Sequence, residues 1–160
     1  MKMKKRINWK ILVFSFIFVY LAAFIGSMLT FQETKTAWYE SIKPSITPPN
    51  WVFPVVWNIL FFLIALSLYF SLIAVKNRNF KLKIKFVFGI NLFLNVLWSL
   101  FYFSFKNPVF AFFDLIALWL TILAMIFITY KADKKASLLL FPYLLWVSFA
   151  GILNYLSAFG

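Results

Sequence analysis

Five long apolar stretches alternate with short polar segments along the chain. They cover residues 9–30, 51–75, 82–105, 108–130 and 137–159. Each is long enough to cross a hydrocarbon core of roughly 30 Å, which takes about 20 helical residues. The pattern predicts an all-α fold, a single domain over residues 1–160 that forms an integral membrane bundle of five transmembrane helices. The first stretch is longer than a signal-peptide core and no small-residue cleavage site follows it, so we expect it to be retained.

The composition supports a lipid environment and excludes several kinds of chemistry. Hydrophobic residues make up 64% of the chain and charged residues only 12%, which is more apolar surface than a soluble domain of this size can bury. The chain contains no cysteine and no histidine. Disulfides, thiol catalysis, zinc sites of the Cys/His type and a Ser-His-Asp triad are therefore excluded. We expect no metal site and no required cofactor.

The basic residues gather at the ends of the apolar stretches, on alternating sides. One side holds Lys2, Lys4, Lys5, Arg6, Lys10, Lys76, Arg78, Lys81, Lys83, Lys85, Lys131, Lys134 and Lys135, and the other holds Lys35, Lys43 and Lys106. Loops rich in Lys and Arg stay cytoplasmic. The distribution predicts a plasma-membrane protein with a cytoplasmic N-terminus and an outer C-terminus. The net charge of +12 is thus a topology signal, and we expect no nucleic acid partner.

Residues 31–50 form a connection that is long for two adjacent membrane helices, which are commonly joined by about 2–8 residues. The segment contains Trp38 and Tyr39 and several prolines, which restrict the backbone. We expect an ordered cap over the outer end of the bundle. The alternative is a plain tether whose aromatic residues rest in the membrane interface.

Polar side chains inside the predicted helices lie on a few faces and at similar depth. Asn91, Asn95 and Ser99 are spaced by four residues, with Trp98 beside them. Trp57 and Asp114 lie about 9–10 Å below the outer ends of their helices, at about 1.5 Å per residue. The fifth stretch has a row at steps of four: Trp146, Ala150, Asn154 and Ala158.

Two interpretations of these polar groups stay open. They can line a ligand pocket with aromatic walls and a lid, or they can serve as hydrogen bonds between helices, worth about 0.6 kcal/mol each. Asp114 is the one acid inside a predicted helix, where a charge costs about 2.5–3.5 kcal/mol, so we expect it to face the interior or hydrated surroundings. In the first stretch, Ala22, Gly26 and Thr30 form a small-residue face for packing within the chain or for a dimer.

Three separated motifs resemble those of the TspO/MBR family, which includes bacterial tryptophan-rich sensory proteins and mitochondrial translocator proteins, the peripheral-type benzodiazepine receptors. The first runs from Trp38 to Trp57, with the letters WYESIKPSITPPNWVFPVVW. The second is NLFLNVLWS, from Asn91 to Ser99, and the third is PYLLWVSFAGILNY, from Pro142 to Tyr155. The resemblance covers the whole chain in order, and it identifies the protein as a bacterial member.

The resemblance implies a five-helix bundle, often a homodimer, whose pocket is closed by the first loop. Such a pocket binds protoporphyrin IX, haem-related tetrapyrroles or benzodiazepine-type ligands, in a sensor, carrier or transporter within the lipid bilayer. The positions that match the family's pocket are Tyr39, Trp57, Asn95, Trp98, Asp114, Trp146 and Ala150.

Two alternatives remain from the resemblance and the residues. A light-dependent porphyrin-degrading enzyme would use Trp57 and Trp146 as its catalytic positions. A small transporter of other amphipathic compounds would need intramembrane charge for ion coupling, where only Asp114 is available. One departure concerns sterols, because Tyr155 is followed by Leu-Ser-Ala-Phe-Gly without the basic residue of the mitochondrial cholesterol motif.

Overall fold

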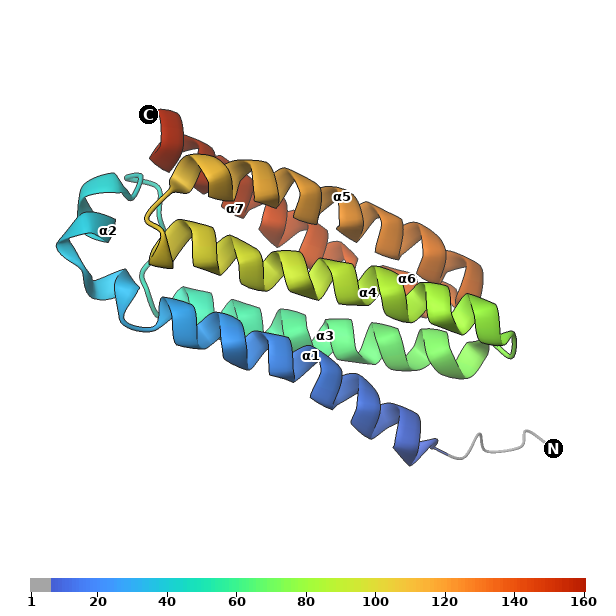
Figure 1. Cartoon of the computed structure of the whole chain (residues 1–160). Helices are drawn as coiled ribbons and strands as arrows, with labels where there is room; N and C mark the ends of the chain where they lie inside the picture. The colour runs from blue at the N-terminus through green and yellow to red at the C-terminus, as the bar shows by residue number, and fades with distance from the viewer. Residues whose placement is uncertain (1–6) are drawn as a thin grey trace.

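The fold is a bundle of long helices that run side by side (Figure 1). The computed structural model describes residues 7–160, so Lys2, Lys4, Lys5 and Arg6 lie outside the described residues. The long helices are α1 (Trp9–Thr30), α3 (Val52–Ala74), α4 (Arg78–Ser99), α5 (Pro108–Ala132) and α7 (Phe141–Phe159). The short ones are the 3₁₀ helix η1 (Glu33–Lys35), α2 (Ala37–Ile42), the π-helix η2 (Leu100–Ser104) and α6 (Lys134–Leu138).

The predicted fold class is confirmed. The described residues contain five helical segments long and apolar enough to cross a membrane, and no strand. The chain is a multi-pass membrane protein.

Asparagine and aspartate side chains set where several helices begin. Asn8, Asn77 and Asn107 each accept a hydrogen bond from the backbone N–H three residues further on. Asn77 starts α4 four residues before the apolar stretch that the sequence marked. The first turn of α4 is therefore charged and lies outside the apolar stretch. Hydropathy locates the part of the helix within the membrane, but it does not locate the end of the helix.

The fifth membrane segment is broken near its start. Residues Leu139 and Leu140 form a turn between α6 and α7, and Pro142 occupies the first turn of α7. Proline lacks the N–H that would continue a helix from the preceding residues, but it is tolerated in a first turn. The stretch predicted at 137–159 is thus two helices rather than one.

The turn from α4 to α5 is wound differently from the rest of α4. In η2 the backbone N–H of Phe105 donates to the carbonyl of Leu100, one residue beyond the α-helical partner. Lys106 follows with φ of 50°, a left-handed conformation that reverses the chain before Asn107 caps α5. These two features place Phe101, Tyr102 and Phe103 beneath loop 31–50.

The core lies between the long helices and consists of apolar side chains from α3, α4, α5 and α7, together with Val19 of α1. Its largest fully buried members include Ile64, Leu68, Ile84, Phe88, Ile122, Met125 and Tyr143. Of the most apolar stretch of α3, 50% of residues are buried in the bundle, against 11% for α1. Gly26 of α1 is buried, and a Cβ there would lie 3.7 Å from the Ser99 hydroxyl. The small-residue face of α1 therefore packs within the chain, while the homodimer stays a prediction.

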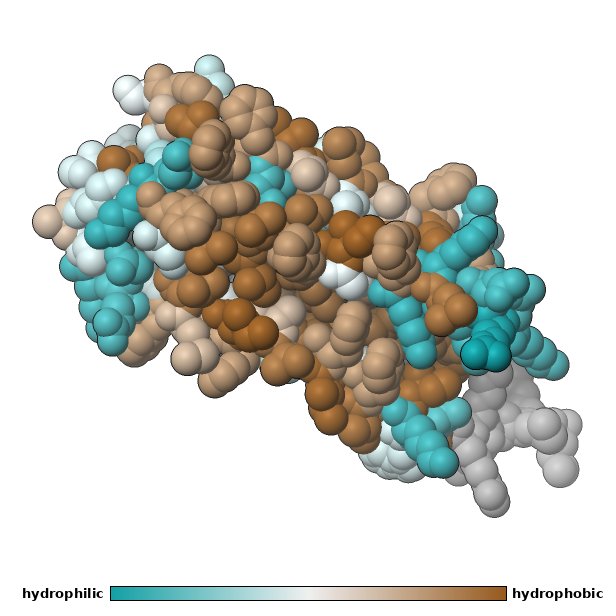
Figure 2. All heavy atoms as spheres, viewed as in Figure 1, coloured by the Kyte–Doolittle hydropathy of each residue, from teal (hydrophilic) through white to brown (hydrophobic). Residues whose placement is uncertain are grey.

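The surface has a broad hydrophobic band with hydrophilic residues at the two ends of the long axis (Figure 2). We call the end with the start of α1, the α3–α4 connection and α6 the basic end. Within residues 7–160 it holds Lys10, Lys76, Arg78, Lys81, Lys83, Lys85, Lys131, Lys134 and Lys135. The opposite end, with loop 31–50 and the α4–α5 turn, is the cap end.

Candidate functional site

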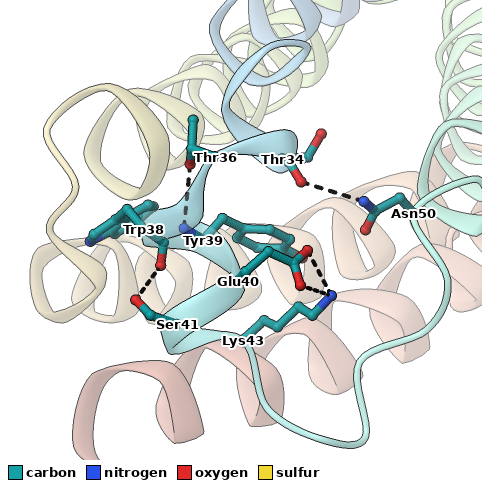
Figure 3. A network of polar contacts seen from close by, with 8 residues as sticks. All are labelled: Thr34, Thr36, Trp38, Tyr39, Glu40, Ser41, Lys43 and Asn50. Atoms are coloured by element: carbon teal, nitrogen blue, oxygen red, sulfur yellow. Dashed lines mark hydrogen bonds and ion pairs between the residues drawn. The ribbon is translucent and has the colours of Figure 1, made fainter.

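Loop 31–50 is built from short helices that are closed by local hydrogen bonds (Figure 3). The Thr36 hydroxyl caps α2 by accepting from the backbone N–H of Tyr39. Lys43 pairs with Glu40 at 2.6 Å. The amide of Asn50 donates to the carbonyl of Thr34 at 3.4 Å, which joins the two ends of the loop. The segment predicted as a cap or a tether thus has internal structure.

Aromatic side chains of α2 pack on η2. The ring of Trp38 lies 5.9 Å from that of Tyr102, edge to face, and the ring of Tyr39 lies 5.9 Å from that of Phe103. Tyr39 is only 6% exposed. Burial, followed by the proximity of Tyr102 and Glu40, raises the pKa of the Tyr39 hydroxyl to about 12. Its neutral form is therefore the one that packs here.

Lys106 makes an ion-pair contact and a cation–π contact beside these rings. Its Nζ lies 3.8 Å from Glu33 and 5.9 Å from the centre of the Trp38 ring. An exposed ion pair contributes little by itself, typically about 0–1 kcal/mol. The aromatic contacts therefore contribute more than the ion pair to the packing of loop 31–50 on the α4–α5 turn.

The amides of α4 bond to α5 and α7. Asn91 donates to the Thr121 hydroxyl at 2.9 Å and accepts from the Tyr143 hydroxyl at 3.1 Å. Asn95 donates to that same hydroxyl at 3.3 Å. Tyr143 is fully buried. For Asn91 and Asn95, the structure shows the interhelical hydrogen bonds that were one of the two interpretations open from the sequence.

A second set of hydrogen bonds lies nearer the cap end. The Trp98 indole N–H donates to Asn154 at 2.8 Å, and Asn154 in turn donates to the carbonyl of Pro108 at 2.7 Å. The Trp98 ring also stacks on Tyr102 at 5.1 Å. Trp98 and Tyr39 therefore belong to one aromatic cluster, with Tyr102 and Phe103 between them.

Aromatic rings form the contact between α3 and α7. Trp57 lies edge to face with Tyr143 at 6.1 Å, and Phe53 lies edge to face with Trp146 at 5.9 Å. Trp57, Trp146 and Ala150 are all half-buried at the side of the core. The indole N–H of Trp146 is buried and has no hydrogen-bond partner. We call this contact the α3–α7 seam.

Asp114 is held apart from these networks. The residue is 8% exposed, and its Oδ2 is buried without a hydrogen-bond partner. The Asn91–Thr121 bond fixes how α4 and α5 run past each other in opposite directions. Counting from that pair puts Asp114 at the level of Trp98, beneath the cap cluster. An unpaired carboxylate oxygen at this depth needs a partner, because burying it alone is costly.

The buried polar atoms without a hydrogen-bond partner belong to residues of the cap-end part of the bundle. Within residues 7–160 the buried side-chain atoms without a hydrogen-bond partner are Glu33 Oε2, Thr47 Oγ1, Asp114 Oδ2 and Trp146 Nε1. Of these, Glu33 Oε2 has the ion-pair contact with Lys106 at 3.8 Å, and the other three have no such contact. Glu33 and Thr47 belong to loop 31–50. Asp114 lies in the second turn of α5, and Trp146 packs against Phe53 at the cap-end start of α3. More than 90% of buried polar groups in proteins are paired, so exceptions that gather at one end require an explanation.

None of the seven residues selected from the sequence lines either of two open hollows on the surface of the described residues. Those hollows lie at the basic end, along α4 and between α1, α3 and α4. At the cap end the aromatic side chains fill the space against one another. The structure joins Tyr39 to Trp98, and Asn95 to Trp57 through Tyr143, while Asp114 and Trp146 are left with unpaired atoms.

Sequence reasoning did not select Tyr143, although it connects three of the site's helices. A signal was present, because Tyr143, Trp146 and Ala150 are spaced by three and four residues and share one face of α7. Phe53 and Phe103 were also missed. Phenylalanine occurs 23 times in this chain, so its presence on any one face carries little information.

Comparison with known proteins gives a consistent result over nearly the whole chain. The model of the TspO/MBR family matches residues 14–158. The "Tryptophan-rich protein TspO" of Archaeoglobus fulgidus is 42% identical over 90% of this chain and 92% of its own length. The "Tryptophan-rich sensory protein" of Cereibacter sphaeroides is 30% identical over 74% of this chain and 73% of its own. The human "Translocator protein" is 31% identical over 84% and 80% of the two chains.

Proposed function

Because the chain belongs to the TspO/MBR family, we propose that this membrane protein binds a tetrapyrrole in the cap-end half of its bundle. The ligand is of the protoporphyrin IX or haem-related class, and flat benzodiazepine-type compounds would compete for the same place. The protein then acts as a sensor or carrier of that ligand. The residues proposed to contact it are Tyr39, Trp57, Asn95, Trp98, Asp114, Trp146 and Ala150.

The observation that carries the proposal is the position of the unpaired atoms. Trp146 offers a buried N–H donor and Asp114 a buried oxygen acceptor, both beneath loop 31–50. The propionic acid groups of a tetrapyrrole would supply both missing partners, since a carboxylate accepts a hydrogen bond from the Trp146 N–H and a protonated carboxyl group donates one to the Asp114 oxygen. Polar groups that fix orientation within an otherwise aromatic site are typical of small-molecule sites.

The α3–α7 seam provides the place where a flat ligand can enter. Its contacts are edge-to-face rings of Trp57, Tyr143, Phe53 and Trp146, and no hydrogen bond among the described residues joins α3 to α7. Separating these rings breaks no polar interaction, and a macrocycle would replace each ring contact with a stacking contact. Asn95 would contact the ligand beside Tyr143, to which it is already bonded.

The test is a titration of the purified protein in detergent with protoporphyrin IX in the dark. Binding is followed by the shift of the porphyrin's main absorption band and by quenching of tryptophan fluorescence. We expect saturable binding that weakens by about tenfold in Trp146→Phe, because an N–H donor to a charged group contributes roughly 1.5–3 kcal/mol. Trp57→Phe should weaken binding less, since a ring remains to stack.

Trp9→Phe is the matched control, because Trp9 is exposed at the basic end, far from the seam. It should bind as the parent does. Equal affinity of Trp146→Phe, Trp57→Phe and Trp9→Phe would show that porphyrin binds elsewhere, and the proposed site would be wrong. A defined product formed only in light, and lost in Trp57→Phe or Trp146→Phe, would instead support the degrading enzyme.

A further inference from the structure

Two adjoining hollows at the basic end share Lys85. The smaller, of about 260 Å³, lies between α1, α3 and α4 and is lined by Lys10, Lys81 and Lys85 together with Ile11, Phe14 and Leu72. The larger is an open groove of about 730 Å³ along α4, lined by Leu82, Phe86, Gly89, Ile90 and Phe93 below Lys83 and Lys85. Three lysine side chains therefore line the smaller hollow, and Lys85 also borders the apolar groove.

These amines are not neutralised by the protein. In the part of the chain that the structure describes, both ion pairs lie at the cap end. The one acid at the basic end, Asp133, uses a carboxylate oxygen to accept the backbone N–H groups of Lys135 and Ala136. Lys85 also lies 4.7 Å from the ring centre of Phe14, which holds its charge between α1 and α4.

The length of the groove matches one leaflet of a bilayer. Leu82 and Phe93 are eleven residues apart, which is about 16 Å along a helix. Half of a hydrocarbon core of roughly 30 Å is about 15 Å. Gly89 lines the groove near its middle, and a Cβ there would touch the Phe18 ring at 3.6 Å, so α1 packs closely against this part of α4.

We propose that this groove is a binding site for an anionic phospholipid of the leaflet at the basic end. Lys10, Lys81 and Lys85 bind the phosphate, and one acyl chain lies along α4 past Gly89. Basic pockets between membrane helices bind anionic headgroups in this way. The charge count from the sequence predicts that this is the cytoplasmic leaflet. The site is separate from the cap-end site, so neither proposal depends on the other.

The test measures phospholipid retained by the full-length protein in detergent, by native mass spectrometry, during titration with dioleoyl phosphatidylglycerol or dioleoyl phosphatidylcholine. The parent should retain one phosphatidylglycerol in preference to phosphatidylcholine. Each lysine near a charged headgroup contributes about fivefold in affinity. Lys10→Gln, Lys81→Gln and Lys85→Gln together should therefore weaken phosphatidylglycerol binding by on the order of a hundredfold.

The matched control removes Lys131, Lys134 and Lys135, which lie at the same end and carry the same total charge. It should bind as the parent does. Equal losses in the two triple variants would show a general attraction of the basic end for anions and would overturn the site. If the first triple variant fails to fold, Lys85→Gln against Lys135→Gln makes the same comparison.

A second pair of variants tests the acyl groove. Phe86→Ala with Phe93→Ala should weaken phosphatidylglycerol binding on the order of threefold, because the groove loses its dispersion contacts. Phe113→Ala with Phe127→Ala, equally exposed on α5, should have no effect. Displacement of the lipid by an equal concentration of inorganic phosphate would mean that the amines hold a free anion, and the lipid site would be wrong.

Discussion

The buried polar residues fall into a group that bonds internally and a group that does not. Asn91, Asn95 and Tyr143 satisfy one another across three helices. Asp114 and Trp146 each keep an atom without a partner. A hydrogen bond between membrane helices contributes about 0.6 kcal/mol on average, whereas an unpaired buried group costs about 1–3 kcal/mol. The first group therefore supports stability, and the second lowers it unless a ligand binds.

Tyr143→Phe should reduce the free energy of unfolding by about 1 kcal/mol. The change keeps the ring against Trp57 but removes the hydroxyl shared by Asn91 and Asn95. Unfolding by an ionic detergent, followed by circular dichroism, measures the difference. Tyr130→Phe is the control, since Tyr130 is exposed near the basic end of α5 and takes no part in this network. Equal stability of Tyr143→Phe and the parent would mean that the network contributes nothing.

Asp114→Asn should leave the free energy of unfolding unchanged or raise it, while weakening the binding of protoporphyrin IX. The amide has the shape of the carboxylate but avoids the cost of placing a charge in the membrane, about 2.5–3.5 kcal/mol at mid-depth. The two effects are measured on one preparation by thermal unfolding and by the dark titration. A clear loss of stability would show that Asp114 has a structural partner that the unpaired Oδ2 does not reveal.

The seven candidate residues came from the family resemblance, and several of them were also placed at similar depth because depth follows from residue number along a helix. The sequence could not show which atoms would pair. That depends on the rotation of each helix about its axis, which packing of the whole bundle decides. Trp98 illustrates the limit, because its spacing beside Asn95 suggested a pocket wall, whereas its N–H is used to bond Asn154.

At the scale of elements, the long helices agree with the predicted apolar stretches, whereas the local structure of the connections was not predicted from the sequence. The sequence predicts the five membrane segments because length and hydropathy are sufficient to do so. It does not predict η2, the left-handed Lys106 or the helical turn of α2, since these depend on contacts between loop 31–50 and the α4–α5 turn. The break before α7 was foreseeable from Pro142 but lies within a continuous apolar stretch.

The packing of α1 against α4 leads to opposite effects for two substitutions of Gly26. Gly26→Ala should raise the free energy of unfolding by up to about 1 kcal/mol, because alanine favours helix and its Cβ would contact the Ser99 hydroxyl at 3.7 Å. Gly26→Leu should lower it, because the larger side chain must separate the two helices. Thermal unfolding in detergent measures both. Equal effects of the two variants would mean that α1 does not pack closely here.

The packing of α2 should weaken as pH rises from 10 to about 12. The pKa of Tyr39 is raised from 10.0 to about 12 by burial. Below pH 10 the hydroxyl is neutral in both states, so the contact contributes fully. Between these values the unfolded loop loses its proton and the folded one does not, so folding becomes less favourable. Thermal unfolding of Tyr39→Phe should lack this part of the pH dependence, and Tyr130→Phe should retain it.

For the whole molecule, the two ends differ in charge and in structure. The cap end carries a folded loop with two ion pairs, and the basic end carries lysines beside open grooves. Within residues 7–160, the three basic segments that the sequence assigned to one side all lie at one end of the bundle (Figure 1). The geometry thus agrees with the alternation on which the orientation was predicted.

The orientation itself can be tested directly, because the chain has no cysteine. Single cysteines at Ser41, exposed in α2, and at Lys76, exposed between α3 and α4, each mark one end. A thiol reagent that does not cross membranes should label Ser41→Cys on intact cells. It should label Lys76→Cys only after the cells are permeabilised. The reverse pattern would place the basic end outside.

The hydrogen bonds between helices also determine how long each polar side chain lacks its partner while the chain is being synthesised. In α1, three hydroxyl groups donate to carbonyls of their own helix; they belong to Ser15, Ser27 and Thr30. These groups are therefore paired before any other helix has been made. Asn95 and Trp98 of α4 bond to partners 48 and 56 residues later in α7. At roughly 5–20 residues per second, the Asn95 amide and the Trp98 indole N–H remain without these partners for several seconds after α4 leaves the ribosome. During that interval, contact with the insertion machinery would keep these α4 donors from facing lipid without a hydrogen-bond partner.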